Sequence, residues 1–185
     1  ALFNYLFAKK NNGKFILRLE DTDRSRFVKG AEEYIVNALN WAGLTPDESP
    51  AAPGGFGPYR QSERKTLYKE ELEKLILSGK AYYAFDTPEE LAAARSESEQ
   101  KGEVFKYSAH NRAAFRNAIS LSKEELKNEI NKGNGVVRLK VAVGETIVVK
   151  DEIRGVIRIN SDEIDDKILM KADGMPTYHF ANIVD

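Results

Sequence analysis

The residues best suited to chemistry lie close together near the start of the chain, in the run Arg18-Leu19-Glu20-Asp21-Thr22-Asp23-Arg24-Ser25-Arg26. The mostly apolar residues 15–20 predict a short buried strand that ends in this run. Ligands gather at the carboxyl ends of strands in open α/β sheets, so these polar groups are candidates for a binding site. Three carboxylates within four residues repel one another unless a cation, an ammonium group or an arginine lies among them. The run therefore fits a site for a cationic group, and it fits equally well a surface turn whose acids pair with neighbouring arginines.

A second group of polar residues lies near the end of the chain, at residues 171–182. If Thr177 caps a helix, Tyr178 and Asn182 are four residues apart on one face of it. A phenol and a carboxamide on one face can hydrogen-bond a small polar ligand, and they can equally bond each other or water. His179 lies elsewhere around the helix, and we expect it to pack rather than to react.

The remaining polar and glycine-rich clusters do not predict a metal or phosphate site. The acids at residues 162–166 lack the alternating ligands and central glycine of a calcium loop, so we expect them to be solvated. The glycines at 54, 55 and 57 do not join a strand to a helix at the spacing of a phosphate-binding loop. The chain has two distant histidines and no cysteine, so we expect no zinc site.

Composition narrows the class of protein further. The 185 residues are 42% hydrophobic, which is enough for one core or for a domain with a small satellite. The 28 basic side chains nearly balance the 29 acidic ones, which argues against a disordered polyelectrolyte. The absence of cysteine excludes disulfides and fits a reducing, cytosolic compartment. The apolar runs are too short to span a bilayer.

The elements that must position the polar residues alternate between helix and strand, which is typical of an α/β fold. Leu2, Phe3, Leu6 and Phe7 form one apolar stripe of an opening helix. No capping residue precedes that helix, so we expect the chain to be part of a longer protein. Ser62 is expected to cap a later helix. Between the opening helix and the helix after Ser62, a further helix is predicted. Its apolar residues recur at spacings of three and four: Ala31, Tyr34, Ile35, Ala38, Leu39 and Ala42.

The middle of the chain changes character at Thr87. Thr87 and Ser122 each begin a capping box, with a glutamate three residues later, and each box predicts a helix. We therefore expect an α+β insertion at residues 86–166 between two pieces of an α/β domain, residues 1–85 and 167–185. Strands are predicted at residues 81–85, 136–143, 145–159 and 167–171, with turns at Gly144 and Gly155.

Taken together, these runs resemble the bacterial glutamyl-tRNA synthetases, a family of class I aminoacyl-tRNA synthetases. The matching strings occur in the family's order and cover nearly the whole chain, so the resemblance is specific. They are Ala1-Leu2-Phe3-Asn4-Tyr5, Arg18-Leu19-Glu20-Asp21-Thr22-Asp23 with Arg26, Gly57-Pro58-Tyr59-Arg60-Gln61-Ser62-Glu63-Arg64, Val137-Arg138-Leu139-Lys140, Lys150-Asp151 with Arg154-Gly155, and Asp173-Gly174-Met175-Pro176-Thr177-Tyr178-His179-Phe180-Ala181-Asn182.

The resemblance implies a partial Rossmann-type class I synthetase catalytic domain, without its N-terminal strand, interrupted by an α+β insertion that binds the acceptor stem of tRNA. It implies that L-glutamate and ATP, with Mg²⁺, form glutamyl-adenylate, and that glutamate then passes to the 3′ end of tRNA(Glu). The family's His- and Lys-containing signatures for ATP chemistry are absent from this chain. We therefore assign no catalytic residue and expect the chain alone to be inactive. The resemblance further implies a cytoplasmic monomer that needs neither zinc nor a membrane.

The resemblance also implies roles for individual residues. The Glu20 carboxylate helps to hold the ammonium group of glutamate, and Tyr178 and Asn182 line the same pocket. Asp23 and Arg26 lie toward the 3′ end of the tRNA. Candidate contacts to tRNA phosphates, which predict a salt-sensitive complex, are Arg112, Arg138, Lys140 and Lys171.

Three other functions compete with this one. The shorter glutamyl-queuosine tRNA synthetases share the motif Glu20-Asp21-Thr22-Asp23. The long insertion and the match at residues 173–182 nevertheless favour the full synthetase. The same acids fit a metal-dependent nucleotide-sugar transferase, which predicts tight binding of a divalent metal. The chain by itself also fits a weak RNA-binding module, and near-zero net charge does not exclude tRNA because it averages acidic and basic regions.

Overall fold

The computed structural model describes residues 1–22 and 28–185 of the chain. Asp23 and Arg26, with their predicted place toward the 3′ end of tRNA, lie outside the described residues. The described residues form two compact units, Ala1–Tyr68 and Lys69–Asp185. The domain boundaries expected at residues 85 and 166 stay a prediction.

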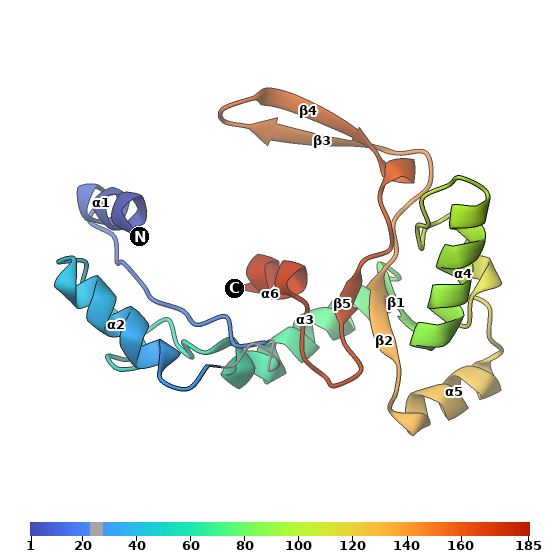
Figure 1. Cartoon of the computed structure of the whole chain (residues 1–185), viewed down its shortest axis with the longest axis horizontal. Helices are drawn as coiled ribbons and strands as arrows, with labels where there is room; N and C mark the ends of the chain where they lie inside the picture. The colour runs from blue at the N-terminus through green and yellow to red at the C-terminus, as the bar shows by residue number, and fades with distance from the viewer. Residues whose placement is uncertain (23–27) are drawn as a thin grey trace. The chain divides into compact units, whose positions relative to one another are not determined.

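The first unit consists of helices joined by extended segments (Figure 1). Both helices predicted from apolar spacing are confirmed. The stripe of the opening helix is exposed, since Phe3 and Phe7 have 85% and 72% of their surface accessible. The bounds are α1 Leu2–Lys10, α2 Ala31–Trp41, the 3-10 helix η2 Gln61–Arg64, and α3 Lys65–Leu77, which begins in this unit and continues into the second.

Residues 15–20 are extended, but they do not form the continuous buried strand that the sequence predicts. Ile16 makes a parallel bridge to Glu48, and Leu19 makes one to Arg60. The partner therefore changes from one loop to another within a few residues, so no run of consecutive pairs develops. Parallel pairing after a helix is nevertheless what an α/β arrangement requires.

A buried carboxylate, that of Glu48, organises the proline- and glycine-rich loop at residues 45–58. Only 2% of Glu48 is accessible. One of its oxygens accepts a hydrogen bond from Lys14 Nζ at 2.6 Å. The other accepts from the Tyr59 hydroxyl and from the Phe56 backbone N–H, the latter at 3.1 Å. The bonds from Lys14 and then Tyr59 hold the pKa of Glu48 at about 2, below its ordinary value of 4.5.

The second unit contains a three-stranded antiparallel sheet in the order β1-β2-β5. Val137 in the central strand pairs with Tyr83 on one side and Met170 on the other, and it is 3% accessible. The sheet therefore joins segments from before, within and after the predicted insertion. Its strands are β1 Ala81–Ala84, β2 Val136–Leu139 and β5 Ile168–Met170.

A separate hairpin is formed by β3 Thr146–Asp151 and β4 Gly155–Asn160. Figure 1 shows it apart from the three-stranded sheet. The prediction of strand at residues 145–159 with a turn at Gly155 is thus confirmed, as two paired strands. They are joined by a turn immediately before Gly155, whose φ of 75° favours glycine.

Both predicted capping boxes are present. The Thr87 hydroxyl accepts from the Glu90 backbone N–H, and the Glu90 carboxylate accepts from the Thr87 N–H. Ser122 makes the same reciprocal pair with Glu125. Within residues 1–22 and 28–185, no helix is long and apolar enough to cross a bilayer. The remaining helices are α4 Pro88–Gln100, η3 Arg112–Ala114, α5 Lys123–Lys132, η4 Ser161–Glu163 and α6 Tyr178–Val184.

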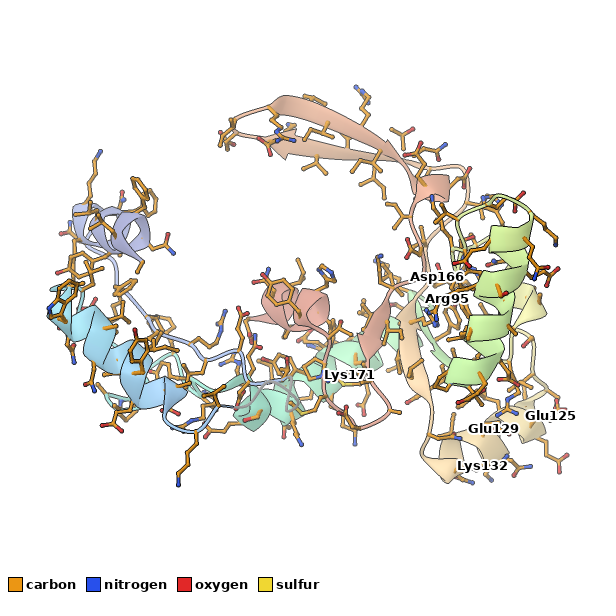
Figure 2. All side chains as sticks on the ribbon, viewed as in Figure 1. Arg95, Glu125, Glu129, Lys132, Asp166 and Lys171 are labelled. Carbon is orange, nitrogen blue, oxygen red and sulfur yellow. The ribbon has the colours of Figure 1, made fainter. Side chains whose placement is uncertain are left out.

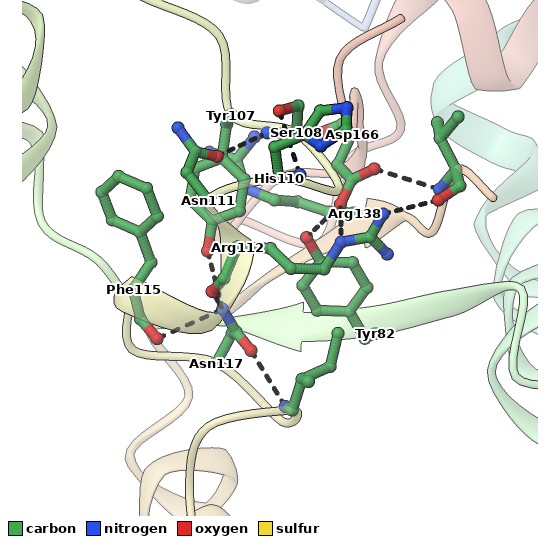
Figure 3. A network of polar contacts seen from close by, with 12 residues as sticks. Tyr82, Tyr107, Ser108, His110, Asn111, Arg112, Phe115, Asn117, Arg138 and Asp166 are labelled. Atoms are coloured by element: carbon green, nitrogen blue, oxygen red, sulfur yellow. Dashed lines mark hydrogen bonds and ion pairs between the residues drawn. The ribbon is translucent and has the colours of Figure 1, made fainter. Parts of the chain in front are cut away.

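Asp166 is fully buried in the second unit, which corrects the expectation that the acids at residues 162–166 are all solvated. Its carboxylate accepts hydrogen bonds from the Tyr82 hydroxyl at 2.6 Å and from the Val141 N–H at 3.0 Å. Arg112 Nε lies 3.2 Å from the same carboxylate (Figure 3). Burial and the bond to Asp166 raise the pKa of Tyr82, so its hydroxyl stays a donor. These partners are distant in sequence, which is why a local pattern did not reveal them.

We predict that Gly54→Ala destabilises the first unit, while Gly55→Ala does not. A Cβ at Gly54 would lie 2.3 Å from Glu48 Cδ, and Glu48 cannot move without losing its donors. A Cβ at Gly55 meets nothing within 4 Å. Urea unfolding is expected to show a loss of about 1–3 kcal/mol for Gly54→Ala. Equal stability of the two variants would contradict this packing.

We predict that Glu48→Gln is most destabilising at neutral pH. Because the folded pKa of Glu48 is about 2 and its ordinary value is 4.5, the ionised carboxylate contributes stability above about pH 4.5. That contribution is lost as the pH falls from 4.5 toward 2. Urea unfolding of the wild type and Glu48→Gln across this range should show a shrinking difference between them. A constant difference would show that the charge of Glu48 is not involved.

We predict that Asp166→Asn lowers the free energy of unfolding by about 3–5 kcal/mol, because Arg112 is left buried without its counter-charge. Asp165→Asn is the matched control. Asp165 pairs with Lys167 at 2.8 Å on the surface, and its loss is expected to cost about 1 kcal/mol or less. Denaturant melts of both variants test this, and similar costs would refute the assignment.

Candidate functional site

The extended segment that ends at Glu20 is hydrogen-bonded to the segment before α3. Leu19 donates its backbone N–H to the Tyr59 carbonyl at 2.8 Å. The Leu19 carbonyl accepts from the Gln61 N–H at 3.0 Å. The backbone just before Glu20 is therefore held on both its donor and its acceptor side.

Asp21, just after Glu20, takes the capping role that the sequence predicts for Ser62. The carboxylate of Asp21 accepts the Ser62 backbone N–H at 2.8 Å and the Ser62 Oγ–H at 2.5 Å. Because η2 already begins at Gln61, Ser62 lies inside the helical turn and its N–H needs an outside acceptor. The prediction that Ser62 caps the helix is therefore wrong. The cap comes from a residue 41 positions earlier.

The Glu20 side chain is exposed, and among the described residues its carboxylate makes no hydrogen bond or ion pair. Its neighbours Leu19 and Asp21 are partly buried, so Glu20 is the most exposed of the three. A carboxylate that is exposed on a fixed backbone can accept hydrogen bonds from an ammonium group. This is the arrangement that the predicted role of Glu20 requires.

Tyr178 and Asn182 lie four residues apart on α6 in the second unit, whereas Glu20 belongs to the first unit. Both side chains are exposed, and Tyr178 is 53% accessible. Thr177 occupies the N-cap position as predicted, but its hydroxyl donates to the Ile168 carbonyl at 2.8 Å and does not cap the helix. This bond ties the start of α6 to β5.

The turn between β5 and α6 presents further polar groups. Lys171, labelled in Figure 2, lies 3.8 Å from the carboxylate of Asp173. The other oxygen of Asp173 accepts from the Met175 N–H at 2.9 Å. His179 is exposed, and its ring meets the Tyr178 ring edge to face at 5.6 Å. His179 therefore packs at the surface.

Arg112 and Arg138 are buried, at 6% and 7% accessible. Arg112 donates to the Val141 carbonyl in addition to pairing with Asp166. Arg138 donates to the Asp166 carbonyl at 3.0 Å, and its guanidinium lies 3.8 Å from the centre of the Tyr107 ring (Figure 3). A phosphate would reach either group only by displacing these partners. These internal contacts weigh against the phosphate contacts predicted for both arginines, which stay predictions.

The other predicted phosphate contacts are more accessible. Lys140 is exposed at the end of β2, and Lys171 is half-buried beside Asp173. The phosphate contacts of Lys140 and Lys171 stay predictions.

Metal-binding side chains do not gather in the part of the chain that the structure describes. No group of three or more His, Cys, Asp or Glu side chains is arranged there so as to hold an ion. Glu20 and Asp21 are among the residues that the structure describes, whereas Asp23 is not.

The chain is similar to known proteins over its whole length. Residues 1–185 match the catalytic domain of the class I tRNA synthetases specific for glutamate and glutamine (E and Q). The chain belongs to this family. It is 55% identical to a glutamate–tRNA ligase of Christiangramia forsetii and 54% identical to one of Flavobacterium johnsoniae. Each alignment covers 100% of this chain and 37% of the relative.

The solved structures agree with this membership. A crystal structure of a glutamate tRNA ligase from Elizabethkingia meningosepticum, in complex with its amino acid, is 51% identical and superposes with a TM-score of 0.94. The match covers 100% of this chain and 37% of that one. The fold is thus that of a class I synthetase catalytic domain, as the sequence predicts. The chain spans a little over a third of the length of the relatives it matches.

Sequence reasoning missed the internal roles of two acids, Asp21 beside the candidate site and Asp166 in the core of the second unit. Asp21 was grouped with Glu20 as a potential ligand group, although its carboxylate is occupied by Ser62. Asp166 was grouped with solvated acids. Neither role has a local signal, because each depends on a donor far away in the chain.

Proposed function

We propose that this chain is part of the catalytic region of an enzyme that attaches L-glutamate to the 3′ end of tRNA(Glu) through glutamyl-adenylate. The observation that carries the proposal is the match of the whole chain, at 49–55% identity, to proteins named glutamate–tRNA ligase. The family match over residues 1–185 supports it independently. The chain alone is proposed to be inactive, because the family's His- and Lys-containing signatures for ATP chemistry are absent from its sequence.

Glutamate recognition is proposed to rest on Glu20, Tyr178 and Asn182. The exposed Glu20 carboxylate accepts hydrogen bonds from the substrate's ammonium group, which is a charge-assisted interaction. Tyr178 and Asn182 add an uncharged hydroxyl and carboxamide, which orient the substrate without a further charge. Such residues bind and orient the substrate, and they carry out no covalent step.

ATP, with Mg²⁺, is proposed to supply the energy for activation, as is typical of the family. Attack by the glutamate α-carboxylate on the α-phosphate forms glutamyl-adenylate and releases pyrophosphate. A tRNA ribose hydroxyl then takes the glutamyl group and releases AMP. The enzyme's contribution is positioning and charge stabilisation.

We propose that the whole enzyme is a cytoplasmic monomer.

Contacts with tRNA are proposed for the exposed Lys140, for Lys171, and for Asp23 and Arg26. Lysine contacts to phosphates release counterions, so binding of tRNA should weaken as salt rises. Arg112 and Arg138 are left out of this set, because their guanidinium groups are buried among internal partners.

The competing functions are less well supported. The matched relatives bear the name glutamate–tRNA ligase, and the described acids do not form a metal-binding group. A glutamyl-queuosine tRNA synthetase would transfer glutamate to a modified base and not to the tRNA 3′ end. Identifying the site of the glutamyl ester on charged tRNA distinguishes the two reactions.

We predict that Glu20→Gln in the full-length enzyme raises the KM for glutamate by roughly tenfold to a hundredfold. The substitution keeps the shape of the side chain but removes one partner of a charged hydrogen bond. The KM for ATP should not change. Aminoacylation of tRNA(Glu) with varied glutamate measures the effect.

The matched control for this prediction is Glu33→Gln, because Glu33 is an exposed glutamate on α2 of the same unit. It should behave as the wild type. Unchanged kinetics in Glu20→Gln would sink the assignment of Glu20, and failure of the wild type to charge tRNA with glutamate would sink the proposed function.

A further inference from the structure

We infer that Asp21 and Ser62 are positioning residues, which hold the backbone at Glu20 so that its carboxylate meets the ammonium group of the substrate. The inference rests on the proposed function, in which Glu20 binds glutamate. It assigns a role to two residues that do not touch the substrate themselves.

The geometry places Glu20 between two fixed neighbours. Before it, Leu19 is bonded to Tyr59 and Gln61 through its backbone. After it, Asp21 is bonded to Ser62 through both carboxylate oxygens, at 2.8 Å and 2.5 Å. The residue that faces the substrate therefore has its backbone held on both sides, although its own side chain has no partner among the described residues.

The holding segment is itself anchored. Ser62 lies in η2, which continues directly into the helix α3. Tyr59 is 4% accessible, and its hydroxyl donates to the buried Glu48. Asp21 is thus fastened to the start of a helix, whose free N–H groups also favour a carboxylate.

The carboxylate of Asp21 is occupied, which separates its role from that of Glu20. Each oxygen of Asp21 accepts a bond from Ser62, one from the backbone and one from the hydroxyl. Without these bonds the chain after Glu20 could rotate. A displacement of about 1 Å at a binding group can cost up to about a hundredfold in rate or affinity.

The test is a double-mutant cycle in the full-length enzyme with Asp21→Ala, Ser62→Ala and the double variant. We expect Asp21→Ala to raise the KM for glutamate about tenfold or more. Ser62→Ala keeps the backbone bond and should raise it less. The double variant should resemble Asp21→Ala, because both changes break one interaction and their effects are not additive.

Asp21→Asn distinguishes positioning from direct contact with the substrate. The asparagine oxygen still accepts the Ser62 N–H, and its amide can donate to the Ser62 hydroxyl. We expect a KM for glutamate within about twofold of the wild type, since the geometry survives. If Asp21 touched the ammonium group itself, loss of its charge would raise the KM as strongly as Asp21→Ala does.

A merely structural role gives a different result. A partly unfolded enzyme loses active molecules, so kcat falls while the KM of the folded fraction stays the same. Ser78→Ala is the control, because it removes a serine hydroxyl bond to the Leu75 carbonyl just after α3. It should leave both constants unchanged. If Asp21→Ala does not fold, Ser62→Ala and Asp21→Asn carry the test.

The inference is overturned by an unchanged KM in Asp21→Ala and Ser62→Ala, by additive effects in the double variant, or by an equal loss in Asp21→Asn and Asp21→Ala. These outcomes leave the proposed function intact as long as the wild type charges tRNA(Glu) with glutamate and Glu20→Gln impairs it. A wild type that does not use glutamate overturns both.

Discussion

A carboxylate that is removed from water must be matched by positive charge and hydrogen-bond donors, and each unit of this protein is organised by one such group. In the first unit the group is Glu48, which gathers Lys14, Tyr59 and the backbone at Phe56. In the second unit it is Asp166, which draws together donors from β1, η3 and the segment after β2. The donors come from distant parts of the chain, so satisfying either carboxylate requires the correct tertiary arrangement.

Comparison with these buried acids shows which other acids are available to bind a ligand. Glu48 and Asp166 have their oxygens occupied by protein donors, so they support the fold and cannot bind a substrate. Asp21 is occupied in the same way by Ser62. Glu20 differs from all three, since its backbone is held on both sides while its carboxylate has no partner among the residues that the structure describes. Between the neighbouring acids Glu20 and Asp21, occupancy by internal donors therefore separates the candidate ligand group from its support.

The same reasoning applies to the basic residues. Arg112 and Arg138 are buried in contacts with Asp166, and Arg138 also lies against the Tyr107 ring. Lys140, by contrast, is exposed. Arginine suits the buried positions because its planar, weakly hydrated group donates in several directions at once. A basic side chain in a sequence is therefore a poor guide to phosphate binding until its burial is known.

Local features could be predicted from the sequence alone. The helices followed from apolar spacing, and the capping boxes at Thr87 and Ser122 were identified because all their partners lie within three residues. The sequence runs that match the synthetase family indicated the fold and predicted roles for Glu20, Tyr178 and Asn182. Tertiary structure decided which acids and arginines are buried, that Asp21 and not Ser62 provides the cap, and that residues 15–20 bridge to two different loops. The reason is physical: a capping box is complete within one turn of helix, whereas burial and long-range hydrogen bonds depend on what the folded chain brings next to each residue.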